Sequence, residues 1–237
     1  MFLQDPHPPP DAAVAQDVRA AQADPSWSFL IEPFIWFAGL DGQNSADTSP
    51  PIDLGLSPLD VLGHLDGGFL LNVEARAPEQ RWSLMADGLY LRLKDDEGTS
   101  QTETEATMIE AGGSLPLNES GSVDAIAGLR YIDLSLDVQL GAAVDATARE
   151  TWVEPWIGAR GRVPINETWH VDMRGDVGGF GIGSQFTWQA LAVLGADLGS
   201  GWRFDVGYRA IGIDYDSGDL SFDTRVHGPL FGFAWQN

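Results

Sequence analysis

Polar and apolar residues alternate along nearly every segment between Trp27 and Trp235, and tight turns separate the segments. The clearest example is the segment 169–177, which reads WHVDMRGDV. Its histidine and all its charged residues fall at even positions, and its large apolar residues fall at odd positions. A period of two is that of a β-strand whose two faces meet different surroundings. The sequence therefore predicts an all-β fold.

The chemistry of the two faces indicates where such a sheet would lie. One face mixes acids with arginines, and the other is rich in Trp, Phe and Tyr. This is the pattern of a transmembrane β-barrel, whose outside meets lipid and whose lumen is polar. The chain has no run of about 18 apolar residues for a membrane helix, but a barrel strand crosses with only about 9–11 residues. We therefore predict a closed, antiparallel, up-and-down transmembrane β-barrel over residues 27–237.

Turn residues divide this region into about ten strands, with eight and twelve as the neighbouring alternatives. The predicted ranges are about 27–41, 64–77, 81–94, 102–116, 122–139, 148–164, 168–179, 185–198, 202–215 and 220–235. Connections after the second, fourth, sixth and eighth strands are short, whereas those after the first (about 43–61), third and fifth are longer and acidic. Outer-membrane barrels have short periplasmic turns and longer outer loops, so both termini are predicted to be periplasmic.

Tryptophan residues lie near the ends of the predicted strands, where membrane barrels carry girdles of interfacial aromatic side chains. These residues are Trp27, Trp82, Trp152, Trp169, Trp202 and Trp235. A closed barrel also leaves no unpaired strand edge, which the hydrocarbon of a membrane does not tolerate.

Residues 1–26 differ in composition from the rest of the chain. Four prolines between Pro6 and Pro10 predict an extended lead, and the alanine-rich stretch 11–24 that follows favours a short helix. We interpret residues 1–26 as an N-terminal periplasmic extension, with a helical plug inside the barrel as the alternative. The first residues have no cationic region followed by an apolar one, so we expect a mature or re-engineered start rather than a signal peptide.

The charge balance and the lack of cysteine limit the classes of function. The formal net charge is -22, which disfavours nucleic acid as a partner because that affinity rests on basic patches. The chain has no cysteine, so disulfides, thiolate catalysis and cysteine-ligated metals are excluded. The expected partners are instead outer-membrane lipid, lipopolysaccharide and other proteins of the envelope.

The inward face of the predicted barrel carries a cluster of acids and arginines. Its members are Glu32, Glu74, Arg76, Asp87, Glu110, Arg130, Glu154, Arg160, Arg162, Asp172, Arg174, Asp176, Arg203, Asp205 and Arg209. A barrel of this size has a narrow interior that side chains fill, and an unpaired charge there costs several kcal/mol. We therefore expect interlocked arginine–carboxylate pairs, which suits a chain whose only lysine is Lys94 because the guanidinium fork binds a carboxylate at two points. Structural filling of the lumen is the first interpretation, and a charged constriction or ligand pocket is the second.

Other motifs carry less chemistry. The stretch 214–219, DYDSGD, has the alternating carboxylates of a Ca²⁺ loop, but it lacks a distal glutamate, and a polar hairpin turn is the simpler interpretation. His227 shares a strand face with Ser221 and Asp223, and we expect all three to point inward without forming a triad. His170 is expected to pair with Asp172 in the lumen. No catalytic residue, cofactor or metal site is predicted, and the chain is not expected to be an enzyme.

Several motifs in the last third of the chain resemble a recurring signature of uncharacterised outer-membrane β-barrel proteins of Gram-negative bacteria. They are RGDVGGFGIGS at 174–184 with TWQ at 187–189, GYR at 207–209 with DY at 214–215, and GPLFG at 228–232. The resemblance covers about residues 27–237 and implies the fold and the bacterial outer membrane as the location. It implies no activity.

Three hypotheses about function follow from this sequence. The first is an outer-membrane barrel with a structural or interaction role, for example as a subunit of a larger envelope assembly. The second is a small channel for ions or small solutes, and the third is a soluble, lipocalin-like ligand-binding barrel. A lumen packed shut favours the first, a continuous water path the second, and a charged exterior facing water the third.

Overall fold

The computed structural model describes residues 26–46, 52–56, 65–78, 81–97, 100–118, 120–140, 144–216 and 220–237. Within these ranges the chain forms β-strands joined by turns, and no helix there is long and apolar enough to cross a membrane. The strands are β1 (Ser28–Trp36), β2 (Gly39–Ala46), β3 (Ile52–Leu56), β4 (Leu65–Arg76), β5 (Ser83–Glu97), β6 (Ser100–Pro116), β7 (Val123–Leu140), β8 (Val144–Pro164), β9 (Trp169–Gly178), β10 (Phe186–Gly199), β11 (Trp202–Asp216) and β12 (Leu220–Gln236). Of the predicted N-terminal extension, residues 1–25 lie outside the described residues.

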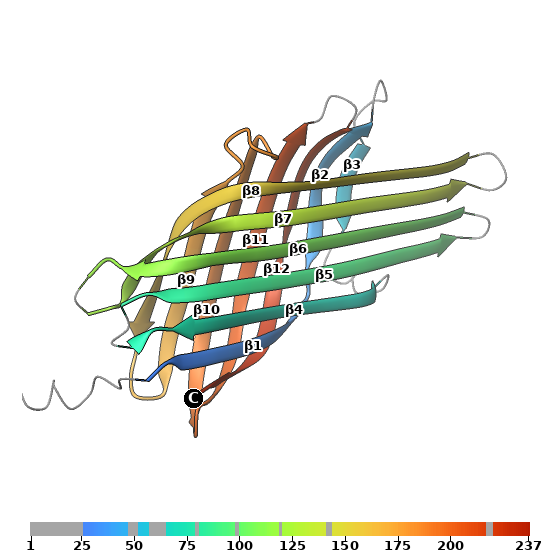
Figure 1. Cartoon of the computed structure of the whole chain (residues 1–237). Helices are drawn as coiled ribbons and strands as arrows, with labels where there is room; N and C mark the ends of the chain where they lie inside the picture. The colour runs from blue at the N-terminus through green and yellow to red at the C-terminus, as the bar shows by residue number, and fades with distance from the viewer. Residues whose placement is uncertain are drawn as a thin grey trace, which may run out of the picture.

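The strands form a closed antiparallel barrel with ten strand positions, which confirms the predicted fold (Figure 1). Each strand from β4 to β12 pairs with the next, and β1 closes the ring by pairing with β4 on one side and β12 on the other. Twelve segments occupy ten positions because β2 continues β1 along β12, and β3 pairs with β2 on the side where β4 pairs with β1. Trp36 pairs with Leu230, and after a break at Phe37 and Ala38, Gly39 pairs with His227.

The first connection differs from its prediction. The range 43–61, expected to be a polar loop, contains the end of β2 and the whole of β3, which pairs with β2. The reason is that β12 extends beyond β1, from His227 to Leu220, and offers a row of backbone groups to the chain beside it. Backbone hydrogen bonds need no apolar side chains, so a polar segment satisfies that edge as well as an apolar one.

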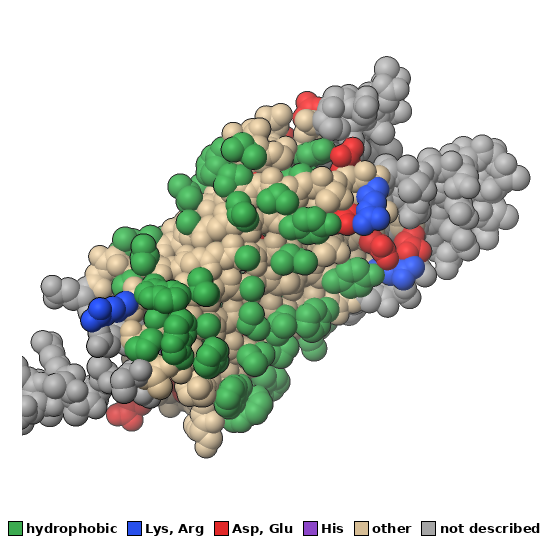
Figure 2. All heavy atoms as spheres, viewed as in Figure 1, with side chains coloured by type: hydrophobic (Ala, Val, Ile, Leu, Met, Phe, Trp, Pro, Cys, Tyr) green, Lys and Arg blue, Asp and Glu red, His purple; other side chains and the backbone are tan. Residues whose placement is uncertain are grey.

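The outside of the barrel carries a band of exposed apolar side chains, called here the apolar belt, and Figure 2 shows one face of it. Exposed leucine, isoleucine, valine and phenylalanine side chains come from successive strands, and examples are Phe29, Leu84, Leu129, Ile157 and Phe233. The exposed tryptophans Trp27, Trp82, Trp169, Trp202 and Trp235 lie at the end of the barrel where β1 begins and β12 ends, called here the terminus end. A continuous apolar surface of this kind is unfavourable in water and favourable in contact with lipid. Trp152 is the exception to the predicted girdle, because its side chain is buried inside the barrel.

Strands β5 to β8 project beyond the apolar belt at the end of the barrel opposite the terminus end (Figure 1). The described outward side chains on this projection include ion-paired residues. Arg92 forms ion pairs with Glu103 and Glu105, and Arg149 forms one with Asp133 at 2.6 Å. The outer surface thus changes from apolar to charged along the same strands, which marks the level where lipid gives way to water.

Candidate functional site: a charged lumen closed on one side

Arg130 lies at the centre of the lumen and is completely buried. Its guanidinium group donates hydrogen bonds to Glu110 at 2.6 Å, Asp176 at 2.6 Å and Glu154 at 3.2 Å. It also donates to the hydroxyl of Thr187 at 2.9 Å, and that hydroxyl donates to Glu154 at 2.5 Å. One arginine therefore bridges three carboxylates, on β6, β8 and β9, through charge-assisted hydrogen bonds.

Two further arginines extend this network across the lumen. Arg174 donates to Glu110 at 2.7 Å and to Asp176 at 2.9 Å, so both acids are shared with Arg130. Arg209 donates to Asp87 at 2.9 Å from the other side of the barrel. The alternation of acids and bases gives each buried charge an opposite neighbour, which offsets the cost of removing it from water. We call Asp87, Glu110, Arg130, Glu154, Arg174, Asp176 and Arg209 the central charged layer.

Trp156 packs beside this layer because two glycines leave room for its ring. Gly128 pairs with both Gly112 and Trp156 in the sheet register. A Cβ atom added at Gly128 would lie 2.7 Å from the indole ring, closer than side chains approach one another. The guanidinium group of Arg174 lies 5.0 Å from the centre of the indole ring, within the range of a cation–π contact.

Apolar side chains fill the lumen next to the central charged layer, on the side away from the termini. The apolar plug, as we call it, consists of Met108, Ile132, Trp152, Ile211 and Tyr215, with Trp36, Leu89, Leu134 and Ile213 packed around it. The rings of Trp152 and Tyr215 stack with their centres 4.2 Å apart. The indole nitrogen of Trp152 donates to Glu154 at 3.1 Å and so joins the plug to the charged layer.

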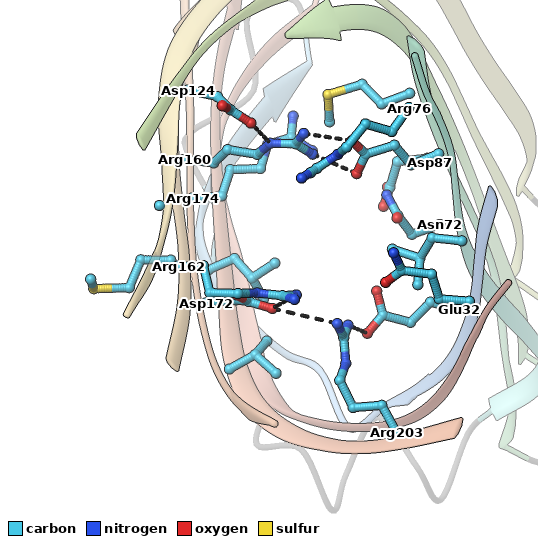
Figure 3. A pocket seen from close by; sticks show the side chains of 18 of the residues that line it. Glu32, Asn72, Arg76, Asp87, Asp124, Arg160, Arg162, Asp172, Arg174 and Arg203 are labelled. Carbon is cyan, nitrogen blue, oxygen red and sulfur yellow. Dashed lines mark hydrogen bonds and ion pairs between the residues drawn. The ribbon is translucent and has the colours of Figure 1, made fainter. Parts of the chain in front are cut away.

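On the terminus side of the charged layer, the lumen contains a cavity of about 550 Å³ (Figure 3). Ser28 and Gln236, at the ends of β1 and β12, belong to its lining, which places its mouth at the terminus end. Two ion-paired groups hold its walls. Arg160 binds Glu74 at 2.6 Å and Asp124 at 3.0 Å, whereas Arg203 binds Glu32 at 2.8 Å and Asp205 at 2.7 Å. The lumen is thus open to solvent on one side and filled on the other.

The structure places all the charged residues of the predicted inward cluster in the lumen. Glu74, Arg76, Asp87, Arg160, Asp172, Arg174, Arg203 and Arg209 line the cavity, and Arg130, Glu154, Asp176 and Asp205 are buried behind its walls. Glu32, Glu110 and Arg162 belong to the same networks. Sequence reasoning missed the apolar plug, because an inward apolar residue has the same period as an inward charge and gives no signal of its own.

The histidines do not assemble a catalytic centre in the part of the chain that the structure describes. His170 is buried, with ring nitrogens 3.6 Å from Asp172 and 3.5 Å from Asp197. The expectation that His227 and Asp223 point inward is wrong. Their inward neighbour Thr224 is buried, whereas His227 lies on the outer surface, within 2.6 Å of both Tyr208 and Asp41.

Metal ligands are not grouped in the described ranges either. No three histidine, aspartate or glutamate side chains there are placed to hold a metal ion. Residues 217–219 of the candidate Ca²⁺ loop lie outside those ranges.

Comparisons with known proteins bear on the fold alone. No protein-family model and no curated protein matches the chain. Among solved structures, the outer-membrane protease OmpT from Escherichia coli superposes with a TM-score of 0.57 at 8% identity, over 91% of this chain and 98% of that one. The translocator domain of the autotransporter NalP from Neisseria meningitidis gives a TM-score of 0.48 at 12% identity, over 95% and 97%. The chain has the fold of outer-membrane β-barrel proteins.

Proposed function

We propose that this protein is a barrel of the bacterial outer membrane with a closed lumen and a structural or interaction role. The observation that carries the proposal is the apolar plug packed on the fully buried Arg130 network. Side chains at this level make contacts with one another across the lumen, as they do in the filled interior of a small barrel. A solute would have to break both layers to pass.

The orientation we propose has both termini in the periplasm. The turns at the terminus end are short, and strands β5 to β8 project at the other end, as expected for periplasmic turns and an outer-facing surface. The apolar belt would contact lipid and lipopolysaccharide, and the charged projection would be available to other molecules at the cell surface. A subunit of a larger envelope assembly is one form that this role would take. No enzymatic activity is proposed.

The two other hypotheses have less support. A channel for ions or small solutes has the cavity in its favour, but the cavity reaches only the central charged layer. A soluble, lipocalin-like barrel would bury its apolar face, whereas Leu84, Leu129 and Ile157 are each more than half exposed on the outside of the barrel.

Planar-bilayer recording tests the closed lumen. We expect the purified protein to insert and to give no discrete conductance steps, because the plug leaves no water path. Folding of the protein is verified separately, by comparing the gel mobility of heated and unheated samples of the same preparation. The double variant Trp152→Ser with Tyr215→Ser, which loses the stacked pair of the plug, should gain conductance. Discrete steps from the unmodified protein would overturn the closed barrel and favour the channel.

A further inference from the structure

The lumen cavity has unused hydrogen-bond donors on its β8–β9 wall, and unused acceptors beside Arg76 on the opposite wall (Figure 3). On the β8–β9 wall, Arg174 uses Nε and Nη2 in ion pairs, and Arg162 does the same with Asp172. The remaining Nη1 group of each arginine makes no hydrogen bond within the described chain. Both arginines line the cavity, so this wall offers N–H donors to a ligand.

The opposite wall offers acceptors. The strand register places Glu32 opposite Asn72, and Asn72 opposite Asp87, so the three residues lie side by side across β1, β4 and β5. Arg203 donates to Oε1 of Glu32, and the carboxyl group of Glu32 is also in hydrogen-bond contact with Asp205. Arg209 occupies only Oδ1 of Asp87. The Asn72 amide makes no hydrogen bond within the part of the chain that the structure describes. Oδ2 of Asp87 and the Asn72 amide thus remain as unused acceptors in the cavity, with the Glu32 carboxyl group beside them.

Arg174 and Asp87 are fixed in the wall of the cavity, whereas Arg162 is 47% exposed and is held by its two bonds to Asp172. The side chains of Arg174 and Asp87 are 8% and 6% accessible, and each is fixed by the ion pairs of the central charged layer. The unused donors and acceptors face the solvent of the cavity, so a ligand that replaces this water has to reproduce its hydrogen bonds. The remaining lining is partly apolar, from Leu30, Leu70 and Leu230, and its volume lies within the range of small-molecule sites.

We propose that this cavity binds a small zwitterion of the size of an amino acid or short peptide, entering from the terminus end. A primary ammonium group has three N–H donors, which match the oxygens of Glu32, Asn72 and Asp87. A carboxylate matches the Nη1 groups of Arg162 and Arg174 on the opposite wall. A ligand with only one kind of charge would leave one wall unsatisfied and meet like charges there. The proposal goes beyond the structural role and holds whether or not the barrel conducts.

Titration calorimetry on the full-length protein in detergent tests this assignment, with trialanine as the probe. Trialanine should bind, whereas N-acetylated and C-amidated trialanine should each bind at least about tenfold more weakly, because each loses one charged end. Asn72→Leu should weaken trialanine binding by about tenfold as well. The barrel should still fold, because Asn72 gives up no hydrogen bond within the protein. Gln185→Leu, in an exposed turn outside the cavity, is the matched control and should change nothing.

The blocked peptides also locate the ammonium group. In the Asn72→Leu variant, N-acetylation of trialanine should weaken binding by less than in the unmodified protein, because one partner of the amine is already lost. C-amidation should weaken binding as much as before. Equal binding of the free and blocked peptides would overturn the proposal. So would the absence of any heat of binding at about 10 mM trialanine, or an Asn72→Leu variant that binds trialanine as the unmodified protein does.

Discussion

Replacing Arg130 by leucine is expected to destabilise the barrel by about 3–5 kcal/mol, the cost of breaking a buried ion pair from one side. Leucine fills much of the space but leaves Glu110, Glu154 and Asp176 without the arginine that bridges them. Arg174 still reaches two of these acids, whereas no other arginine in the described ranges contacts Glu154. Urea unfolding in detergent, followed by tryptophan fluorescence, measures the loss.

Two further variants separate charge from packing. Adding Glu154→Gln to Arg130→Leu removes the stranded carboxylate and should recover part of the stability. Arg149→Leu removes an arginine whose side chain is 65% exposed and whose pair with Asp133 lies on the projection, so it should leave the unfolding curve nearly unchanged. If Arg130→Leu lowered the free energy of unfolding no more than Arg149→Leu, the central charged layer would not stabilise the barrel.

Replacing Ile157 by arginine should destabilise the membrane-embedded barrel by about 2–4 kcal/mol, the cost of a lipid-facing charge at the bilayer midplane. The Ile157 side chain is 56% exposed and lies between Ala127 and Val177 of the neighbouring strands, in the middle of the apolar belt. The measurement is the unfolding free energy in lipid vesicles.

Val163→Arg is the matched control for depth. Val163 is 50% exposed on the same strand but lies about 20 Å along it, next to the turn at the terminus end. Arginine there should cost only about 0–1 kcal/mol, because its side chain reaches the interface. Equal costs at the two positions would mean that no lipid surrounds the belt.

The fold was predictable because the whole barrel repeats one signal. Period-two alternation gives the strands, and the chemistry of the outward face gives the inverted arrangement of a membrane barrel. The positions of Arg130, Arg174 and Arg209 on the inward face follow from their parity alone. Once the inward face is known, ion pairing of its charged residues can also be predicted, because an unpaired charge in a narrow lumen is costly.

The odd or even position of a residue along its strand predicts which face it lies on, but not its distance from residues across the lumen. Arg130 bridges β6, β8 and β9, and those contacts depend on strand stagger, which the sequence does not display. Parity also fails where the register breaks, as at Phe37 and Ala38, and where an aromatic residue near a strand end faces inward. Trp152 has the sequence signature of a girdle residue but stacks on Tyr215 inside the barrel.

The central claim is that this barrel has lipid on its outside, and the cysteine-free chain allows a direct test. A nitroxide label is attached to a single cysteine at Met173, which is exposed in the middle of β9, or at Arg149 on the projection. In lipid vesicles the label at Met173 should collide with dissolved oxygen and be shielded from a water-soluble nickel complex, and the label at Arg149 should show the reverse. A label at Met173 that meets the nickel complex as readily as one at Arg149 would contradict the membrane barrel.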